Sequence, residues 1–198
     1  MISLKLLQFQ YYRFSISWPR ILPNATLVVN QLGIDYYNKL INELIANNIQ
    51  PYVTLYHWDL PQYIQDMGGF ASPIVIEHFR NYADVLYKHF GDRVKKWITF
   101  NEPFNFCVQG YGIGIVAPLV KGMGVDEYLC AHHMLQAHAS AYHLYKAEYV
   151  GTQKGEIGIS LNTDHFYPMD ASVGVDVIDR AQTIRVSFNE LLYNDSKC

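Results

Sequence analysis

Apolar residues along this chain follow two different spacings, which predict alternating strands and helices. Four short segments are either continuously apolar or alternate between apolar and polar side chains, as strands do. They lie at residues 12–18, 51–57, 96–101 and 156–162. Between them, apolar residues recur every three to four positions, which is the period of an amphipathic helix. We expect helices over 31–48, 73–90, 126–149 and 173–193.

Two of these helices have a well-defined expected core face. In the helix over 31–48, that face consists of Leu32, Tyr36, Leu40, Leu44 and Ile45. The helix over 73–90 begins with a proline, which suits the first turn of a helix. Its expected core face consists of Ile76, Phe79, Ala83, Leu86 and Phe90.

The alternation of strands and helices implies a parallel sheet with helices outside it. Two closures are compatible with this order: an open doubly wound sheet and a barrel. Polar and aromatic residues follow three of the predicted strands, at 57–59, 101–102 and 162. The loops after the strands of a barrel build one shared site, so this convergence favours a barrel. No linker or low-complexity segment interrupts the chain, and we expect residues 1–198 to form a single domain.

The third predicted strand ends abruptly in Asn101, Glu102 and Pro103. A carboxylic acid at the end of an apolar strand is a candidate general acid. Asn101 brings an amide that can form a hydrogen bond with a hydroxyl group, and Pro103 fixes the turn that follows. The alternative is an ordinary strand-capping glutamate, which this context disfavours.

Two further groups of residues are candidates for binding. His57, Trp58 and Asp59 combine a donor and acceptor ring, a stacking surface and a carboxylate. A loop held together by its own hydrogen bonds explains them equally well. Arg13 lies in a strand flanked by aromatic residues, and a buried arginine is rare unless it is paired. Its expected partner is a carboxylate, Glu102 or Asp59, or a polar substrate; a structural ion pair is the alternative.

Composition and charge exclude several other functions. The chain has 198 residues, 50% of them hydrophobic, and a net charge of −3, so nothing favours nucleic acid as a partner. No apolar stretch reaches the roughly 18 residues of a membrane span. The Gly-rich segment 110–124 lacks the Lys-Ser/Thr of a phosphate-binding loop. The histidines at 132, 133 and 138 lack metal-site spacing, so we expect neither a cofactor nor a metal.

Cysteines and sequons say little about the compartment. Cys107, Cys130 and Cys198 match no zinc motif and are too few for a disulfide framework, so we expect buried free thiols. Residues 1–7 lack the basic start and the cleavage site of a signal peptide. The sequons at 24–26 and 194–196 are near the number expected by chance and hint only weakly at secretion. Localisation and oligomeric state stay open.

Four motifs of the chain resemble those of glycoside hydrolase family 1, whose members are β-glucosidases and related enzymes built on a TIM barrel. They occur in the family's order, as YRFSISWPRI at 12–21, YHWDLPQ at 56–62, FGDRV at 90–94 and TFNEP at 99–103. The sequences of these motifs are most similar to those of insect-like β-glucosidases and lactase-phlorizin-type domains. The resemblance implies retaining, two-carboxylate hydrolysis of a β-glucoside or an oligosaccharide.

The resemblance also assigns roles to single residues. Glu102 is expected to be the acid/base catalyst, and Asn101 to bind the sugar 2-hydroxyl group. His57 is expected to bind another sugar hydroxyl, with Trp58 forming part of the pocket wall. Arg13 is expected to lie near the catalytic carboxylates and to keep one of them ionised. Glutamate at 102, where plant thioglucosidases have glutamine, implies O-glycosides.

The chain also departs from the family pattern. The family's nucleophile lies in a Thr-Glu-Asn-Gly motif, which does not occur here. The sequence matches strands two to five of the eight, so we expect a partial barrel with two open sheet edges and an exposed apolar face. We expect this polypeptide alone to be poorly stable and inactive. The alternative is a non-catalytic family member that acts as a sugar-binding or interaction protein.

Overall fold

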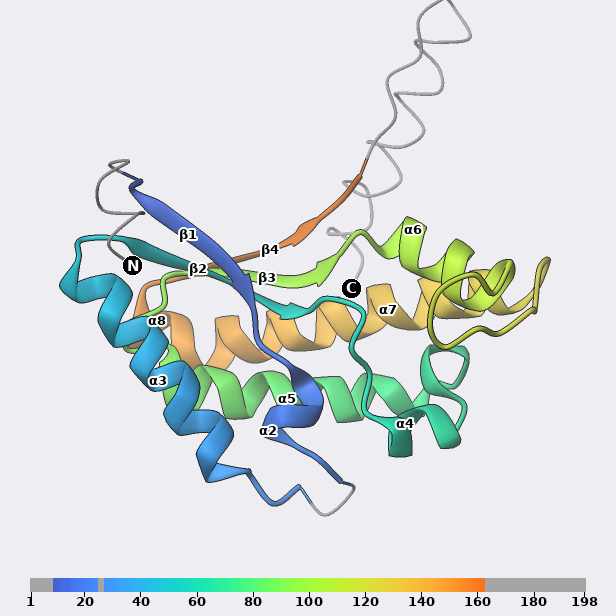
Figure 1. The fold of residues 1–198 in the computed structure, drawn as a ribbon, viewed down its shortest axis with the longest axis horizontal. Helices are drawn as coiled ribbons and strands as arrows, with labels where there is room; N and C mark the ends of the chain where they lie inside the picture. Colours follow the sequence, from blue (N-terminus) through green and yellow to red (C-terminus); the bar gives the residue numbers. More distant parts are fainter. Residues whose placement is uncertain (1–8, 25–26, 163–198) are drawn as a thin grey trace, which may run out of the picture. The chain divides into compact units, whose positions relative to one another are not determined.

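The described part of the protein is built around one parallel sheet (Figure 1). The computed structural model describes residues 9–24 and 27–162, nearly all of which belong to one compact unit. The strands are β1 (Tyr11–Ser15), β2 (Gln50–Tyr56), β3 (Lys96–Asn101) and β4 (Glu156–Ser160). They lie in the order β1-β2-β3-β4, and each neighbouring pair is parallel. A doubly wound sheet reverses its strand order, whereas this unbroken order is that of a barrel segment, as expected.

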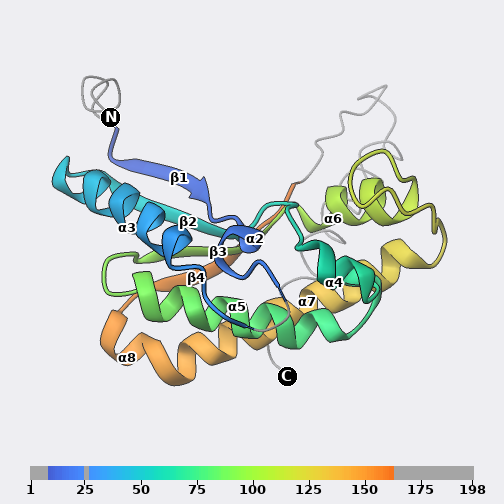
Figure 2. The same ribbon diagram turned by 60° about the horizontal axis from the view of Figure 1, so that its bottom comes forward.

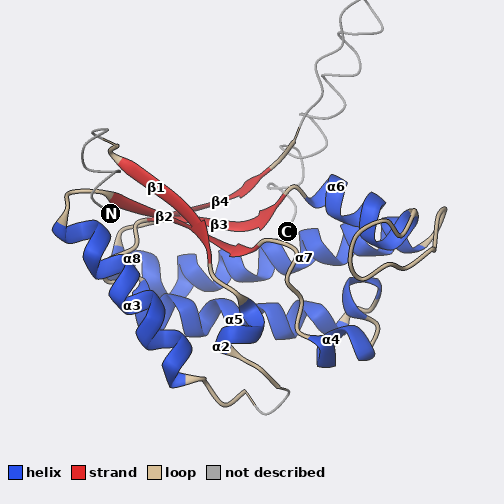
Figure 3. Cartoon of the chain, viewed as in Figure 1, coloured by secondary structure: helices blue, strands red, loops and turns tan. Residues whose placement is uncertain are grey.

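The long helices all lie on one face of the sheet. They are α3 (Gln31–Ala46), α5 (Ile74–Phe90) and α7 (Asp126–Leu144). In Figure 2, α5 and α7 run side by side beneath the strands. No described element covers the opposite face of the sheet (Figure 3). Within residues 9–24 and 27–162, no helix combines the length and the apolar character needed to cross a membrane.

Short helical segments lie between the long ones. They are α2 (Trp18–Ile21), α4 (Gln62–Asp66), α6 (Pro103–Phe106), α8 (Val150–Gln153), the 3-10 turn η1 (Gly69–Ala71) and the π-helical turns η2 (Cys107–Gly112) and η3 (Tyr145–Tyr149). The Gly-rich segment 110–124 therefore starts inside the helical turn η2, which the sequence did not reveal. The predicted helix over 173–193 lies outside the described residues.

The core face predicted for α3 is wrong in most of its members. Leu32, Tyr36 and Ile45 are 80%, 53% and 41% exposed. The buried face consists of Gly33, Ile34, Tyr37, Ile41 and Leu44. Two apolar sets with helical spacing wind around this helix, and tertiary packing selects between them. A Cβ atom on Gly33 would lie 2.4 Å from the carbonyl oxygen of Arg20, so this close approach to α2 turns the Gly33 side inward.

The core face predicted for α5 is largely confirmed, and α5 holds two strand ends together. Phe79, Ala83, Leu86 and Phe90 are all buried. Tyr82, also buried, stacks on Trp18 with ring centroids 4.8 Å apart. Its hydroxyl group donates to the carbonyl oxygens of Ile16, at 3.0 Å, and Leu55, at 2.9 Å. Helix α5 therefore fixes the C-terminal ends of β1 and β2 relative to each other.

The prediction of free thiols is wrong for Cys107 and Cys130. These two residues, from η2 and α7, form a disulfide with their Cα atoms 5.6 Å apart, and both are buried. They are 23 residues apart in the sequence. Spacing alone did not indicate the pair because it is the packing of η2 against α7 that brings the thiols together. Cys198 lies outside the described residues.

Loss of this disulfide should destabilise the fold. Closing a loop of 23 residues restricts the unfolded chain by about 3 kcal/mol in the chain-entropy model. We expect Cys130→Ser to lower the free energy of unfolding in urea by about that amount, with Cys198→Ser as the control that leaves the bonded pair intact. Equal stabilities of the two variants, or peptide mapping that finds both thiols free, would contradict this assignment.

Candidate functional site

An irregularity in β3 directs Asn101 away from the helices. The pairing of β3 with β4 shifts register between Ile98 and Asn101. Within this stretch, Thr99 bonds to His138 of α7 at 2.7 Å, and Phe100 stacks on Phe79 of α5 at 4.2 Å. Two consecutive side chains thus face the helices. Asn101 consequently emerges on the helix-free face, as residues beside active-site bulges often do.

Asn101 connects the ends of three strands. Its side chain is 4% exposed. Its Oδ1 atom accepts a hydrogen bond from the Nη2 group of Arg13 on β1. Its Nδ2 group bonds to Nε2 of His57 at 3.1 Å, and its backbone carbonyl accepts from Nε1 of Trp58 at 2.9 Å. The predicted binding residues Arg13, His57, Trp58 and Asn101 are therefore in direct contact.

The Asn101 contact defines the protonation state of His57. The Nδ2 group can only donate, so Nε2 of His57 accepts and the ring proton lies on Nδ1. Desolvation by burial lowers the pKa of His57, the charge of Arg13 lowers it further, and Glu102 opposes both. The side chain is exposed, and Nδ1 has no hydrogen-bond partner among the described residues. His57 is thus a neutral donor available to a ligand.

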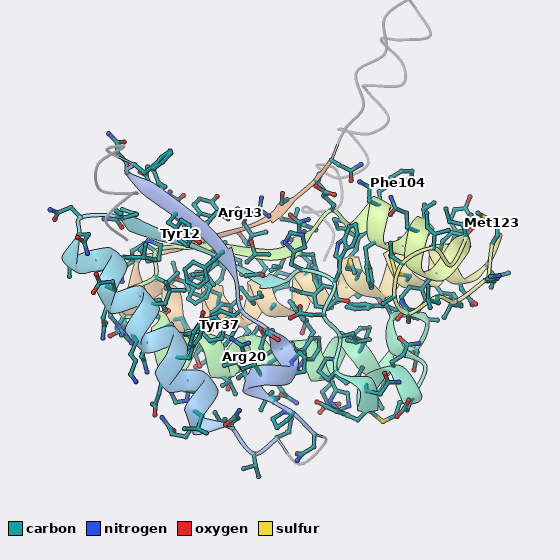
Figure 4. All side chains as sticks on the ribbon, in the orientation of Figure 1. Tyr12, Arg13, Arg20, Tyr37, Phe104 and Met123 are labelled. Atoms are coloured by element: carbon teal, nitrogen blue, oxygen red, sulfur yellow. A yellow bond between two sulfur atoms is a disulfide. The ribbon has the colours of Figure 1, made fainter. Side chains whose placement is uncertain are left out.

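Arg13 does not have the carboxylate partner that the sequence suggested. Its Nε group donates to the hydroxyl oxygen of Thr54 on β2 at 3.1 Å, and its Nη2 group donates to Asn101. None of the ion pairs within the described ranges includes Arg13. The side chain is exposed on the helix-free face of the sheet (Figure 4). The expectation of burial was wrong because β1 has no neighbouring strand on its other side among the described residues.

Glu102 is held in an unusual backbone conformation. Its φ angle is 50°, in the left-handed region that non-glycine residues rarely adopt. The following proline disfavours the right-handed helical conformation, and the Glu102 amide donates to the carbonyl oxygen of Ser160 on β4 at 2.8 Å. Asn105, which the sequence did not single out, donates to Glu102 Oε2 at 3.1 Å. These contacts fix the carboxylate at the end of β3.

Trp58 follows its strand in the same way. Its φ angle is 73°, so the first residue after β3 and the second after β2 both have left-handed backbones. Such conformations cost about 1–3 kcal/mol each and concentrate at functional sites. The indole of Trp58 lies 5.9 Å from the ring of Phe106 on α6, which supports it from the helix side.

Asp59 plays a supporting part in the same loop. Burial raises the pKa of Asp59, and a hydrogen bond with the Ser17 side chain partly opposes the rise. The backbone N–H groups of Asp59 and His57 oppose the rise in the same direction. The alternative of a loop held by its own hydrogen bonds thus applies to Asp59, while His57 and Trp58 face Asn101.

The histidines of α7 have structural contacts. His133 Nδ1 bonds to the carbonyl oxygen of Phe70 at 2.9 Å, and His138 Nδ1 bonds to Thr99. Within the described residues, no group of three or more His, Cys, Asp and Glu side chains is arranged to hold a metal ion.

Arg13 and Glu102 act on His57 with opposite charges, so removing each charge should change the pKa of His57 in opposite directions. Arg13→Gln removes a nearby positive charge and should raise the pKa of His57, whereas Glu102→Gln removes a negative charge and should lower it. The measurement is an NMR titration of the His57 ring signals. Lys88→Gln, on the exposed face of α5, is the control that should leave the pKa of His57 unchanged. Changes of the same sign in both variants would contradict the proposed arrangement.

Comparison with known proteins assigns the chain to a family. The model of glycosyl hydrolase family 1 matches residues 2–198. β-Glucosidase 12 of Oryza sativa subsp. japonica is 50% identical over 179 residues, which cover 83% of this chain and 35% of that protein. Lactase/phlorizin hydrolase of Homo sapiens is 47% identical over 179 residues, which cover 89% of this chain and 9% of that protein.

A solved structure agrees with these relatives. The aphid myrosinase structure has a TM-score of 0.85 and 48% identity, covering 89% of this chain and 38% of that chain. The chain thus spans about a third of the length of the rice relative, at 35%. Because the family model covers nearly the whole chain and the parallel strand order is that of a barrel segment, the chain belongs to glycosyl hydrolase family 1.

Proposed function

We propose that this chain supplies the acid/base half of a site that hydrolyses β-O-glycosides, with Glu102 as the acid/base catalyst. The observation that carries the proposal is the position of Glu102, in a left-handed backbone directly after Asn101. Asn105 and the Ser160 carbonyl group fix this residue from two sides. A general acid must be held within hydrogen-bonding reach of the leaving oxygen, and a fixed carboxyl group meets that need.

The neighbouring residues are suited to bind the sugar. The Nδ1–H of His57 has no hydrogen-bond partner among the described residues and can donate to a sugar hydroxyl group. Asn101 keeps a second N–H on Nδ2 for the 2-hydroxyl group, a contact that strengthens at the transition state. The half-buried indole of Trp58 offers an apolar surface beside them. All three side chains are fixed by mutual hydrogen bonds before a ligand arrives, which reduces the entropic cost of binding.

Retention of configuration requires a second carboxylate. The two carboxyl groups of a retaining glycosidase lie about 5–5.5 Å apart. Asp59, the other carboxylate near His57, is partly buried and bonded to Ser17, so it is not suited to be the nucleophile. The nucleophile motif expected for the family, Thr-Glu-Asn-Gly, does not occur in the 198 residues. We therefore propose that polypeptide beyond these residues contributes the nucleophile.

A chimera tests whether this chain supplies the acid/base catalyst while other polypeptide supplies the nucleophile. Residues 9–162 of this chain would replace the matching segment of the rice β-glucosidase, to which the chain is 50% identical. We expect the chimera to hydrolyse an aryl β-glucoside, and Glu102→Gln to reduce kcat by about 10²–10⁴-fold, the usual contribution of general acid–base catalysis. Glu77→Gln, at an exposed carboxylate of α5, is the matched control with unchanged kcat.

The isolated chain gives the complementary result. We expect the purified 198-residue chain to show no hydrolysis above that of its own Glu102→Gln variant. Hydrolysis by the isolated chain that depends on Glu102 would contradict the assignment of the nucleophile to other polypeptide. A folded chimera that binds the glucoside without hydrolysing it would instead support the non-catalytic alternative, a sugar-binding family member.

A further inference from the structure

Arg13 is anchored at two points on two different strands. The Nη2 group donates to Asn101 after β3, and the Nε group donates to Thr54 on β2 at 3.1 Å. A guanidinium group is planar and carries five N–H donors in fixed directions. Two anchors therefore define its plane and leave the remaining N–H groups oriented by them. Because Arg13 is exposed, its long side chain would otherwise sample several rotamers.

Thr54 is a rigid anchor for this group. The side chain is 1% exposed. It lies on β2, where Ser15 of β1 is its register partner and Arg13 is the diagonal neighbour two residues earlier. A β-branched residue in a strand has a restricted χ1 angle. The Thr54 carbonyl oxygen also accepts from the Ile16 amide at 2.9 Å, which fixes the backbone beneath the hydroxyl group.

Thr54 restrains Arg13 independently of His57, which Asn101 cannot do. Asn101 bonds to Arg13 and His57 with the same amide group, so rotation of Arg13 would also disturb His57. The bond from Nε to Thr54 prevents this rotation without contacting His57 or Glu102. A purely structural threonine would instead only fill space between β1 and β2.

We propose that Thr54 is a positioning residue that orients the Arg13 guanidinium group toward an anionic carboxylate or a polar sugar group on the helix-free face of the sheet. The ligand class rests on the proposed glycosidase function. The positioning itself does not, because it is measurable in the isolated chain without a substrate.

The test follows the Arg13 Nε–H signal by ¹H–¹⁵N NMR in the full chain, with Arg13→Lys to assign it. We expect Thr54→Val, which keeps the shape and removes the hydroxyl group, to increase solvent exchange of this Nε–H at least about tenfold, as expected for loss of its acceptor. Thr54→Ser, which keeps the hydroxyl group, should restore slow exchange. The Nε–H of Arg93, bonded to Asp92 at 3.0 Å, is the internal control that stays unchanged.

A second readout reports on the site itself. The charges that act on His57 come from Arg13 on β1 and from Glu102 after β3. Displacement of Arg13 in Thr54→Val should therefore raise the pKa of His57 toward its value in Arg13→Gln, whereas Thr54→Ser should leave it unchanged. Loss of packing alone would not produce this difference between the valine and serine variants.

The wild-type chain provides a result that needs no variant of Thr54. Its Arg13 Nε–H should exchange at least about tenfold more slowly than that of Arg80, which is exposed on α5 and has no side-chain hydrogen bond among the described residues. Equal exchange at Arg13 and Arg80, or unchanged exchange and an unchanged pKa of His57 in Thr54→Val, would overturn the role of Thr54. Inactivity of the chimera would count against the glycosidase function and leave these measurements unaffected.

Discussion

The amide group of Asn101 is the contact on which the rest of the site depends. It is buried, and an unpaired buried amide is costly, so its bonds to Arg13 and His57 are strongly favoured. Its backbone carbonyl group binds Trp58 in addition. One residue thereby joins the ends of β1, β2 and β3, which are far apart in the sequence.

This arrangement has a cost in the backbone. The irregularity in β3 turns Asn101 away from the helices, and the next residue, Glu102, is held at a φ angle of 50°. The surrounding core supports this strain: Tyr82 ties the backbones of β1 and β2 together, and Phe106 of α6 packs against Trp58. Packing interactions on the helix-covered face thus keep the residues of the opposite face in a conformation suited to binding a ligand.

The sequence predicted the parts of this molecule that depend on local pattern. The order of the four strands, most of the buried face of α5 and the polar strand ends were predicted correctly, because each follows from spacing or from an abrupt change of polarity; the first strand is shorter than predicted, because Trp18 already belongs to α2. The buried face of α3 depends on the close approach of Gly33 to Arg20, and the disulfide depends on the packing of η2 against α7. Neither close approach leaves a signal in residue spacing.

The candidate site also combines features that the local sequence pattern predicted with contacts that depend on tertiary packing. His57, Trp58, Asn101 and Glu102 were identified from their place after strands, but the partners of Arg13 were not. A carboxylate was the expected partner on general grounds, whereas Thr54 and Asn101 satisfy the guanidinium group here. Which neighbour an arginine contacts depends on strand register, and register is set by the whole sheet rather than by the residues near Arg13.

The most direct test of the central claim, that Asn101 organises these strand ends into one sugar site, is an NMR titration of the chain with methyl β-glucoside. Saturable shifts are expected for the Trp58 indole and the His57 ring, and they should disappear in Asn101→Ala. The indoles of Trp18 and Trp97, which are 0% and 1% exposed, should not shift in either protein. Shifts that persist in Asn101→Ala, or that are equally large at Trp18 and Trp97, would contradict the claim.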